Sequence, residues 1–304
     1  MSSSERFMML SILIPTYNYD CTELVHSLCV QATGIGVDFE VIVADDASTE
    51  PAVIRGLARI ATMEHCHLLR GTTNVGRAAI RNRLVREAHG EWLLFMDSDG
   101  GLSTSDFLQR YMDAAMSGTV VCGSILHPEQ CPSADRSLRW RYEKAAERRY
   151  TAALRNVHPY DSFRTFNFLA PKSVMEAAPF DENFKRYGYE DVLLGKRLQE
   201  LGIPILHIDN PLLNLDIETN ERFLLKTEEA NETLNAFYPQ LRNHSTLIRW
   251  YERLRSVGLA GVVGFTWRCL APLLRCQLLS NRPSLRLFNA YKLGHFCELR
   301  RCRK

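Results

Sequence analysis

Two carboxylates, Asp97 and Asp99, follow directly on the apolar run 92–96 and are separated only by Ser98. In an extended turn, this spacing can aim oxygen atoms of both side chains at one divalent cation. The same spacing also suits an Asx-turn, in which the carboxylates bind their own backbone. The segment therefore predicts a site for Mg²⁺ or Mn²⁺ or a purely structural polar turn, and the neighbouring segments favour the cation.

Two other apolar runs also end at polar residues. Residues 8–14 are followed by the segment 15–18, and residues 39–44 are followed by Asp45 and Asp46. In open α/β sheets, ligands bind beyond the carboxyl ends of the strands, where such residues would gather. We therefore expect these segments to lie beside the first pair of carboxylates.

A third acidic pair, Glu190 and Asp191, follows a flexible turn at Gly188 and opens an expected helix. The positive end of that helix favours anionic side chains, so the pair can be catalytic or can simply interact with the helix dipole. Further on, His207 ends an expected strand over 203–208. It can be a metal ligand or a buried histidine of the core, and the second is the commoner case.

The elements that must position these residues alternate in type up to residue 99. Expected strands cover 8–14, 39–44, 66–69 and 92–96, and expected helices cover 22–32, 51–62 and about 74–89. Strands separated by single crossover segments form a parallel sheet with helices on both faces. Later elements are less regular, with expected helices at 105–116, 135–154 and 218–237 and strands at 119–125 and 203–208. The fold class is therefore α/β, with a mostly parallel central sheet.

Composition sets further bounds on the protein. The 304 residues are 46% hydrophobic and 24% charged, as is ordinary for a globular protein. The nine cysteines are scattered and include no C-x-x-C pair, so we expect neither disulfides nor a zinc site, which fits a reducing cytoplasm. No apolar run approaches the length of a membrane span, and the interrupted run at 8–14 does not resemble a signal peptide.

Charge is distributed unevenly along the chain. Residues 245–304 hold 12 of the 37 Lys and Arg but only 2 of the 35 Asp and Glu. Within this region residues 256–267 are uncharged, and later apolar clusters are interrupted by arginines. This pattern favours an interfacial helix on an anionic membrane surface, and the alternative is a helical hairpin packed on the rest of the protein. No nucleic-acid partner is expected, because the region is too apolar and has no known motif.

Five segments, taken in order, resemble the family 2 inverting glycosyltransferases with the GT-A fold. They are 11–18 (SILIPTYN), 43–48 (VADDAS), 74–76 (NVG) with Arg81 and Asn82, 97–99 (DSD) and 188–191 (GYED). The resemblance covers about residues 8–215, and the helix at 218–241 is similar to that of bacterial members that build surface polysaccharides. It implies a GT-A domain at 1–242, with a nucleotide-binding half at about 8–100 and an acceptor half at 101–242. A basic helical region at 243–304 would follow.

The resemblance also implies which residues bind the nucleotide-sugar donor. Tyr17 would lie against the base, and Asp46, alone or with Asp45, would accept a hydrogen bond from the base. Arg81, with the turn at 74–76, would support the nucleotide pocket. The donor-binding set implied in this way is Pro15, Tyr17, Asn18, Asp45, Asp46, Asn74, Gly76, Arg81, Asp97 and Ser98.

Metal and base are implied by the same resemblance. Asp99, with Asp97, would hold Mn²⁺ or Mg²⁺ at the diphosphate, and the third ligand would be His207 or its replacement Asn214. The cation would neutralise the leaving group as a Lewis acid. Asp191 would be the general base that takes the acceptor's proton, with Glu190 orienting the acceptor. A single displacement of this kind inverts the anomeric configuration.

Together these features predict a cytoplasmic enzyme, peripheral at the inner face of the cell membrane. It would move a sugar from a nucleoside diphosphate, with UDP expected, to a saccharide or lipid-linked acceptor in surface polysaccharide synthesis. A sugar nucleotidyltransferase is one alternative, but it needs a Gly-rich basic loop after the first strand, which residues 15–18 do not provide. A non-catalytic nucleotide-sugar-binding protein is another, and it would not need both Asp99 and Asp191.

Overall fold

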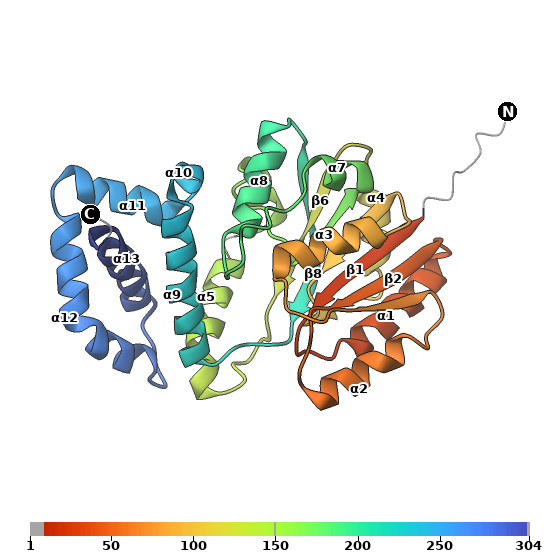
Figure 1. Ribbon diagram of the computed structural model, residues 1–304, viewed down its shortest axis with the longest axis horizontal. Coiled ribbons are helices and arrows are strands. Elements are labelled where there is room, and N and C mark those ends of the chain that lie inside the picture. Colours follow the sequence, from red (N-terminus) through yellow and green to blue (C-terminus); the bar gives the residue numbers. More distant parts are fainter. Residues whose placement is uncertain (1–8, 149, 303–304) are drawn as a thin grey trace. The chain divides into compact units, whose positions relative to one another are not determined.

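The first part of the protein is a parallel α/β sheet. A computed structural model describes residues 9–148 and 150–302 (Figure 1). Strands β1 (Leu10–Thr16), β2 (Phe39–Asp45), β3 (Cys66–Arg70) and β4 (Trp92–Met96) alternate with helices α1 (Thr22–Ile35), α2 (Pro51–Ile60) and α3 (Arg77–Glu87). All four strands are parallel, in the spatial order β3-β2-β1-β4. The predicted α/β class and parallel half-sheet are confirmed.

The second half of the sheet is mixed. Strands β5 (Gly100–Leu102), β6 (Val120–Leu126), β7 (Asn167–Pro171) and β8 (Ile205–Asn214) complete an 8-stranded sheet in the order β3-β2-β1-β4-β7-β6-β8-β5. Strand β7 is antiparallel to both of its neighbours, β4 and β6, and β5 is antiparallel to β8. The reversal at β7 separates the parallel first half of the sheet from the later strands.

One of the later expected helices is divided in the structure. The helix expected over 135–154 is divided into α5 (Ser137–Glu147), preceded by the 3-10 turn η1 (Ala134–Arg136), and α6 (Ala152–Val157). The Thr151 side chain accepts a hydrogen bond from the Leu154 amide, which makes it the N-cap of a new helix. The other helices are α4 (Phe107–Ala114), α7 (Lys172–Ala177), α8 (Glu190–Glu200), α9 (Asn220–Ala236), α10 (Tyr238–Leu241), α11 (Thr246–Ser256), α12 (Ala260–Leu278) and α13 (Leu285–Arg301).

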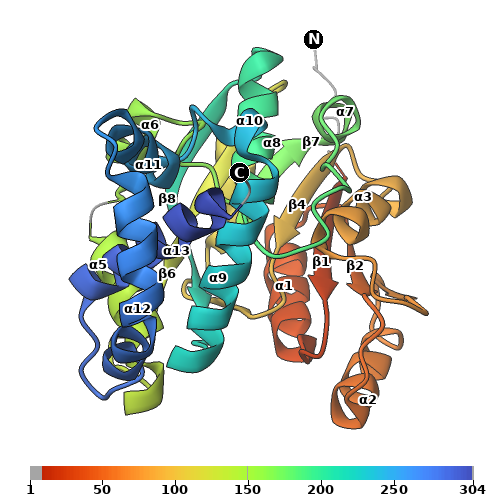
Figure 2. The same ribbon diagram turned by 60° about the vertical axis from the view of Figure 1, so that its left-hand side comes forward.

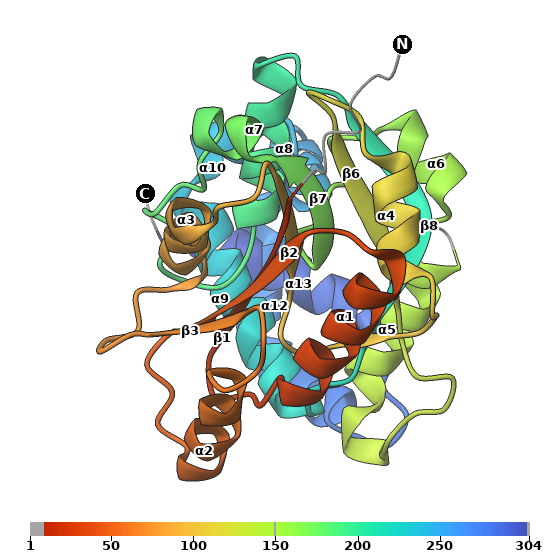
Figure 3. The same cartoon turned by 90° about the vertical axis from the view of Figure 1, so that its right-hand side faces the viewer.

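Helices cover both faces of the sheet because its central strands are apolar on both sides. In β1, Ile12 belongs to the cluster that includes α1 and α4, whereas its neighbour Leu13 belongs to the cluster that includes α3 and α7. Successive residues of a strand point to opposite faces, so a continuous apolar run fills two cores. Figure 3 shows α1 and α4 on one side of the sheet and α3 and α7 on the other.

The chain divides into two compact units. Among the described residues, unit 1 holds 9–126, 150–185 and 194–215, and unit 2 holds 127–148, 186–193 and 216–302. The C-terminal helices therefore share a unit with α5, α9 and the segment Arg186–Leu193. The boundary expected after residue 242 is not where the structure divides.

Unit 2 has its own apolar core, and its helices α12 and α13 form part of it. Buried side chains of α5, α9, α12 and α13 meet there: Leu138, Phe223, Leu224, Leu278, Phe288 and Tyr291. Helix α13 packs between α12 and α9 (Figure 1). Of the described helices, none is by itself long and apolar enough to cross a bilayer, whereas α11 and α12 reach that length and composition together across a bend of 113°.

Candidate active site

The candidate donor side of the site lies in unit 1, at the carboxyl edge of the parallel strands. Strands β1 and β2 end at this edge side by side (Figure 2), where Thr16 pairs with Asp45. The Asp46 amide then donates to the Thr16 carbonyl over 2.8 Å. Since β4 is also parallel to β1, the segment 97–99 emerges from the same edge. The sequence prediction that these segments gather at one edge is confirmed.

Asn18 ties the loop after β1 to the loop after β2. Its backbone amide donates to Ser48 Oγ over 2.8 Å, and its side-chain Oδ1 accepts from the Thr49 amide over 2.8 Å. These hydrogen bonds hold the loop after β1 against the loop after β2. Its neighbour Tyr17 remains 49% exposed, so its ring is accessible for stacking on a flat ligand.

Asp46 holds the turn that precedes α3. One carboxylate oxygen accepts from the Val75 amide over 2.8 Å, and the other accepts from the Gly76 amide over 3.0 Å. Gly76 has φ +87°, a conformation that favours glycine. Asp45 is buried beside it and accepts from the Ser48 amide over 2.8 Å. Both acids thus shape the two loops from which a nucleotide would be bound.

Arg81 of α3 forms an ion pair with Asp97, the residue that follows β4. Arg81 Nη2 lies 2.6 Å from Asp97 Oδ1, and the guanidinium stacks over the Phe180 ring at 5.6 Å. A further hydrogen bond from Nη1 reaches the Arg77 carbonyl over 3.3 Å. The carboxylate of Asp97 is therefore held in one orientation by a buried cation.

Asp99 lies beside the end of β8. Its carbonyl accepts from the Leu215 amide over 2.9 Å, and the next residue, Gly100, pairs with Asn214. Asn214 is thus the downstream residue that the fold brings to the 97–99 turn. Of the two alternatives for a third ligand, the strand register favours this amide.

The prediction of His207 as a metal ligand is wrong. It pairs with Cys122 inside the sheet, roughly 20 Å along β8 from Asn214. Both ring nitrogens are engaged, Nδ1 by Arg155 Nη1 at 3.0 Å and Nε2 by the Pro159 carbonyl at 2.9 Å. Burial, assisted by the charge of Arg155, lowers the pKa of His207 to about 4, so the ring is a neutral part of the core.

The remaining oxygen donors suit a hard cation. Asp97, Asp99 and Asn214 would offer carboxylate and amide oxygens, which Mg²⁺ and Mn²⁺ accept. Within residues 9–148 and 150–302, no three or more His, Cys, Asp or Glu side chains are arranged to hold a metal. Mg²⁺ is commonly bound by one or two carboxylates together with substrate phosphates, so this small donor set fits a cation that arrives with a diphosphate.

The acidic pair 190–191 belongs to unit 2, where α9 holds the preceding loop. The Tyr187 amide donates to Glu229 Oε1 over 3.2 Å, and Thr233 Oγ1 donates to the Tyr187 carbonyl over 3.0 Å. Gly188 follows with φ +101°, and a Cβ added there would lie 2.9 Å from the Ala230 Cβ. The loop therefore approaches α9 more closely than any residue except glycine allows.

Glu190 and Asp191 form the first turn of α8, as predicted. Glu190 is buried, and Asp191 Oδ1 accepts from the adjacent Val192 amide over 2.8 Å. An anionic side chain at this position interacts favourably with the helix dipole. That interaction orients the carboxylate and is compatible with a role as a base.

Backbone strain marks the same loops. Of the described residues other than glycine, four have positive φ, and three of these lie in candidate-site loops: Asn18 at 51°, Ala47 at 65° and Tyr189 at 69°. Such conformations cost about 1–3 kcal/mol each and persist only where the surroundings enforce them. The conformations of these loops therefore lower the stability of both units, and contacts with the surrounding residues must hold them in place.

Sequence reasoning missed the role of Asn82. Its side chain donates to the Phe180 carbonyl over 3.0 Å and accepts from the Phe180 amide over 2.9 Å, and it also donates to Glu182 Oε1 over 2.8 Å. It thereby fastens α3 to the segment that leads towards residue 186. The Arg81-Asn82 pair was visible in the sequence, but its partner almost 100 residues away was not.

A mixed α/β sheet with polar residues gathered at the carboxyl edge of its parallel strands is typical of enzymes that bind a ligand at that edge. The model of the family described as "Glycosyl transferase family 2" matches residues 11–171, which is more than half of the chain. The chain therefore belongs to glycosyl transferase family 2.

Three curated relatives illustrate the range of similarity. Validoxylamine A glucosyltransferase of Streptomyces hygroscopicus subsp. limoneus is 29% identical over 228 residues, which cover 65% of this chain and 49% of that protein. An uncharacterised glycosyltransferase of Bacillus subtilis is 28% identical over 243 residues, which cover 64% of this chain and 62% of that protein. Poly(ribitol-phosphate) beta-N-acetylglucosaminyltransferase of Staphylococcus aureus is 34% identical over 96 residues, which cover 30% of this chain and 16% of that protein. The chain spans less than two thirds of the length of each of these relatives.

Solved structures share the fold at low identity. A mannosyltransferase from Pyrobaculum calidifontis, solved with GDP-Man and Mn²⁺, has a TM-score of 0.57 at 15% identity, covering 95% of this chain and 85% of that one. Mannosyl-3-phosphoglycerate synthase from Rubrobacter xylanophilus has a TM-score of 0.52 at 13% identity, and the match covers 78% of this chain and 75% of that one. The architecture is thus the GT-A fold of glycosyltransferases, as predicted.

Proposed function

We propose that this protein transfers one sugar, with inversion, from a nucleoside diphosphate sugar to a hydroxyl of a saccharide or lipid-linked acceptor, with UDP as the nucleotide. The observation that carries the proposal is the cluster at the carboxyl edge of β1, β2 and β4. There Asp46 holds the turn at Val75 and Gly76, and Arg81 holds Asp97. Family membership supports sugar transfer over nucleotidyl transfer or mere binding.

On the donor side, each residue has a distinct task. Tyr17 would stack on the base, and Asp46, whose carboxylate oxygens each retain a second lone pair, would accept from its imide. Asp45 and Asn18 would keep the two loops in place rather than touch the donor. Arg81 would keep Asp97 turned towards the ribose or the diphosphate.

Asp97, Asp99 and Asn214 would hold a divalent cation, Mn²⁺ or Mg²⁺. When bound, it would neutralise the charge that grows on the diphosphate leaving group. The Mn²⁺ in the Pyrobaculum mannosyltransferase supports this cofactor.

On the acceptor side, Asp191 would take the proton of the attacking hydroxyl, and Glu190 would orient the acceptor. The amide of Val192 keeps the Asp191 carboxylate in one rotamer, so less reorganisation is needed during proton transfer. A single displacement with one base inverts the anomeric carbon.

The setting we propose is cell-surface polysaccharide synthesis, on the cytoplasmic side of a membrane, with region 243–304 contacting anionic lipid. All nine cysteines are free thiols, which suits a reducing compartment. The relative from Staphylococcus aureus is named for transfer to poly(ribitol phosphate), which supports a polymer as acceptor.

The test separates the two halves of the reaction. Purified protein is incubated with Mn²⁺ and a panel of nucleotide sugars, and release of free nucleoside diphosphate is measured with and without acceptor saccharides. Asp191→Asn should keep donor affinity and lose turnover by about 10²–10⁴-fold, because it removes only the base. Asp99→Ala should weaken Mn²⁺-dependent donor binding.

Three outcomes would contradict the proposal. Conversion of a nucleotide sugar to nucleoside triphosphate and sugar 1-phosphate when pyrophosphate is added, with no release of nucleoside diphosphate, would indicate a nucleotidyltransferase. Equal loss of donor affinity and turnover in Asp191→Asn would remove its assignment as base. Donor binding that depends on Mn²⁺ as strongly in Asp99→Ala as in the wild type would remove Asp99 from the cation site.

A further inference from the structure

Helix α12 has an apolar face that unit 2 does not cover. Val262, Phe265, Cys269, Leu273 and Cys276 recur at helical spacing and are all exposed, Phe265 to 58% and Leu273 to 70%. Because these positions lie three or four residues apart, they form one stripe along the helix. At 1.5 Å per residue, the stripe from Val262 to Cys276 is about 21 Å long.

The opposite face of α12 is fixed tightly to α13. A Cβ added at Gly264 would lie 3.0 Å from the Glu298 amide nitrogen, and one at Gly294 would lie 2.6 Å from Trp267. The Trp267 ring in turn lies 5.0 Å from the His295 ring. The exposed stripe therefore belongs to a helix that cannot roll to bury it against its own unit.

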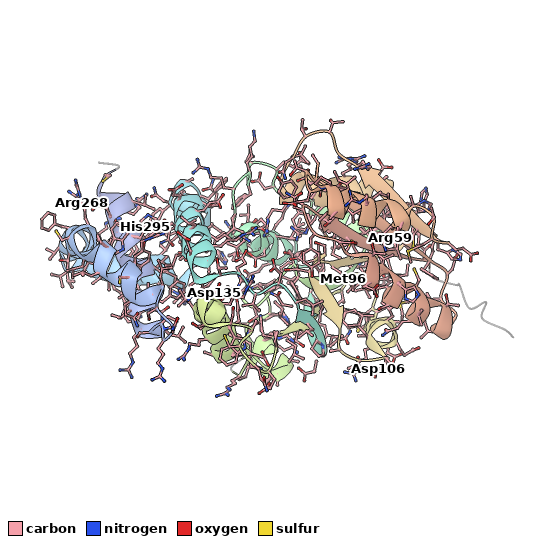
Figure 4. All side chains as sticks on the ribbon, turned by 90° about the horizontal axis from the view of Figure 1, so that it is seen from below. Arg59, Met96, Asp106, Asp135, Arg268 and His295 are labelled. Carbon is pink, nitrogen blue, oxygen red and sulfur yellow. The ribbon has the colours of Figure 1, made fainter. Side chains whose placement is uncertain are left out.

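Exposed basic side chains occur on α12, on α11 and just after α12. Figure 4 shows Arg268 at the outer side of α12 and His295 of α13 at the inner side. On α11, Arg253 stacks on the exposed ring of Trp250 at 5.1 Å, and Arg282 and Arg286 are exposed after the end of α12. Between residues 253 and 297 there are seven Lys and Arg and no Asp or Glu.

This charge pattern favours an anionic bilayer over a second copy of the chain. Two copies meeting through this face would place arginines against arginines without any acid of the same segment to pair with them. Anionic headgroups would instead neutralise them while the stripe enters the acyl boundary. Exposed Trp and Arg beside an apolar stripe are typical of the membrane–water interface.

We propose that the outer face of α12, formed by Val262, Phe265, Cys269, Leu273 and Cys276, lies in the plane of an anionic membrane. The exposed arginines of α11, α12 and the α12–α13 turn would contact its headgroups. The proposal rests on the membrane setting proposed above and names the surface that would provide it. It leaves the chemistry at Asp99 and Asp191 untouched.

The experiment measures sedimentation of the full chain with vesicles of phosphatidylcholine mixed with phosphatidylglycerol, and with vesicles of phosphatidylcholine alone. Phe265→Ser with Leu273→Ser should lower partitioning onto the anionic vesicles by about tenfold or more. The substitutions Arg268→Gln, Arg282→Gln and Arg286→Gln should each lower partitioning onto the anionic vesicles by about fivefold.

A matched control uses exposed apolar residues elsewhere. Val30→Ser with Leu154→Ser removes side chains of similar exposure, 59% and 57%, from unit 1 and should leave partitioning unchanged. Thermal unfolding of all variants checks that they fold. A thiol dye that reports polarity, placed on Cys269 or Cys276 in single-cysteine variants, should shift to the blue with anionic vesicles, whereas the same dye on Cys131 should not.

Three results would overturn the proposal. The first is equal partitioning of the α12 variant and the control. The second is binding to neutral vesicles as strong as binding to anionic ones. The third is a wild-type dimer, detected by light scattering, that dissociates in the α12 variant. Turnover of a soluble acceptor saccharide is measured in parallel, so that loss of the reaction and loss of the membrane surface are recorded separately.

Discussion

The guanidinium of Arg81 lies 2.6 Å from the Asp97 carboxylate, with the Arg81 side chain 3% exposed and that of Asp97 28% exposed. The cation of this pair is thus fixed in the core, while the anion reaches the surface of the carboxyl edge. A partner held in this way restricts Asp97 to one orientation before any ligand binds, which reduces the ordering needed on binding. The pair therefore connects the packing of α3 to the properties of the candidate donor site.

Arg81→Gln should affect both stability and donor binding. Removing one member of a largely buried ion pair should lower the free energy of unfolding by about 2–3 kcal/mol and weaken binding of UDP with Mn²⁺ by about tenfold. Urea unfolding and calorimetric titration measure the two effects. Arg86→Gln changes an exposed arginine of the same helix and should alter neither. If Arg81→Gln also altered neither, the pair would be incidental.

Gly188→Ala should disturb the loop that carries Glu190 and Asp191. The backbone there has φ +101°, and the new Cβ would meet Ala230 at 2.9 Å. Gly118→Ala is the matched control, because it has φ +73° but no atom within 4 Å of the added Cβ. Both should lose about 1 kcal/mol of stability from the backbone conformation. Only Gly188→Ala should also lose turnover while keeping donor affinity, and equal kinetics in the two variants would contradict this.

Removal of the chain after Gln240 should unfold unit 2. The deletion would take away α12 and α13 and uncover Phe223 and Leu224 of α9, with Leu138 of α5. Burial of each such side chain contributes about 1.5–3 kcal/mol, so their exposure is more than a marginal unit tolerates. Near-UV circular dichroism and limited proteolysis of the truncated chain would detect the loss. A truncated protein with the proteolytic stability of the full chain would contradict the shared core.

Stability should fall in acid through His207. Its pKa is lowered to about 4 in the folded state, below the ordinary value of 6.5, so the unfolded chain takes up the proton first. The contribution of the neutral ring is therefore complete above pH 6.5 and is lost as the pH falls towards 4. Urea midpoints measured across this window should decline less steeply in His207→Gln than in the wild type. Parallel curves would show that His207 does not titrate there.

Patterns within single elements predicted a large part of the fold. The apolar runs at 39–44 and 92–96 are β2 and β4, and the acids that follow them emerge at the expected edge. This works because strand character and strand direction depend on neighbouring residues, and parallel strands place their ends together. The Glu190-Asp191 pair at a helix start was predictable for the same local reason.

Contacts between distant segments were outside the reach of such patterns. Asn82 with Phe180 and Arg155 with His207 join residues far apart in the chain. A buried histidine and a ligating histidine look alike in sequence, because the difference lies in what its ring nitrogens meet. The same holds for the C-terminal helices, whose sequence favoured a membrane surface and left a packed helical hairpin as the alternative.

By itself, then, the sequence determined the α/β class, the parallel direction of the first four strands and the residue types at their ends, since each follows from a few adjacent side chains. Only the tertiary structure decided that Asp46 binds the turn at Gly76, that β7 reverses direction, and that α13 packs on α9. These outcomes depend on how surfaces made by separate segments fit together. Local periodicity does not contain that information, because many pairings of the same faces bury similar apolar area.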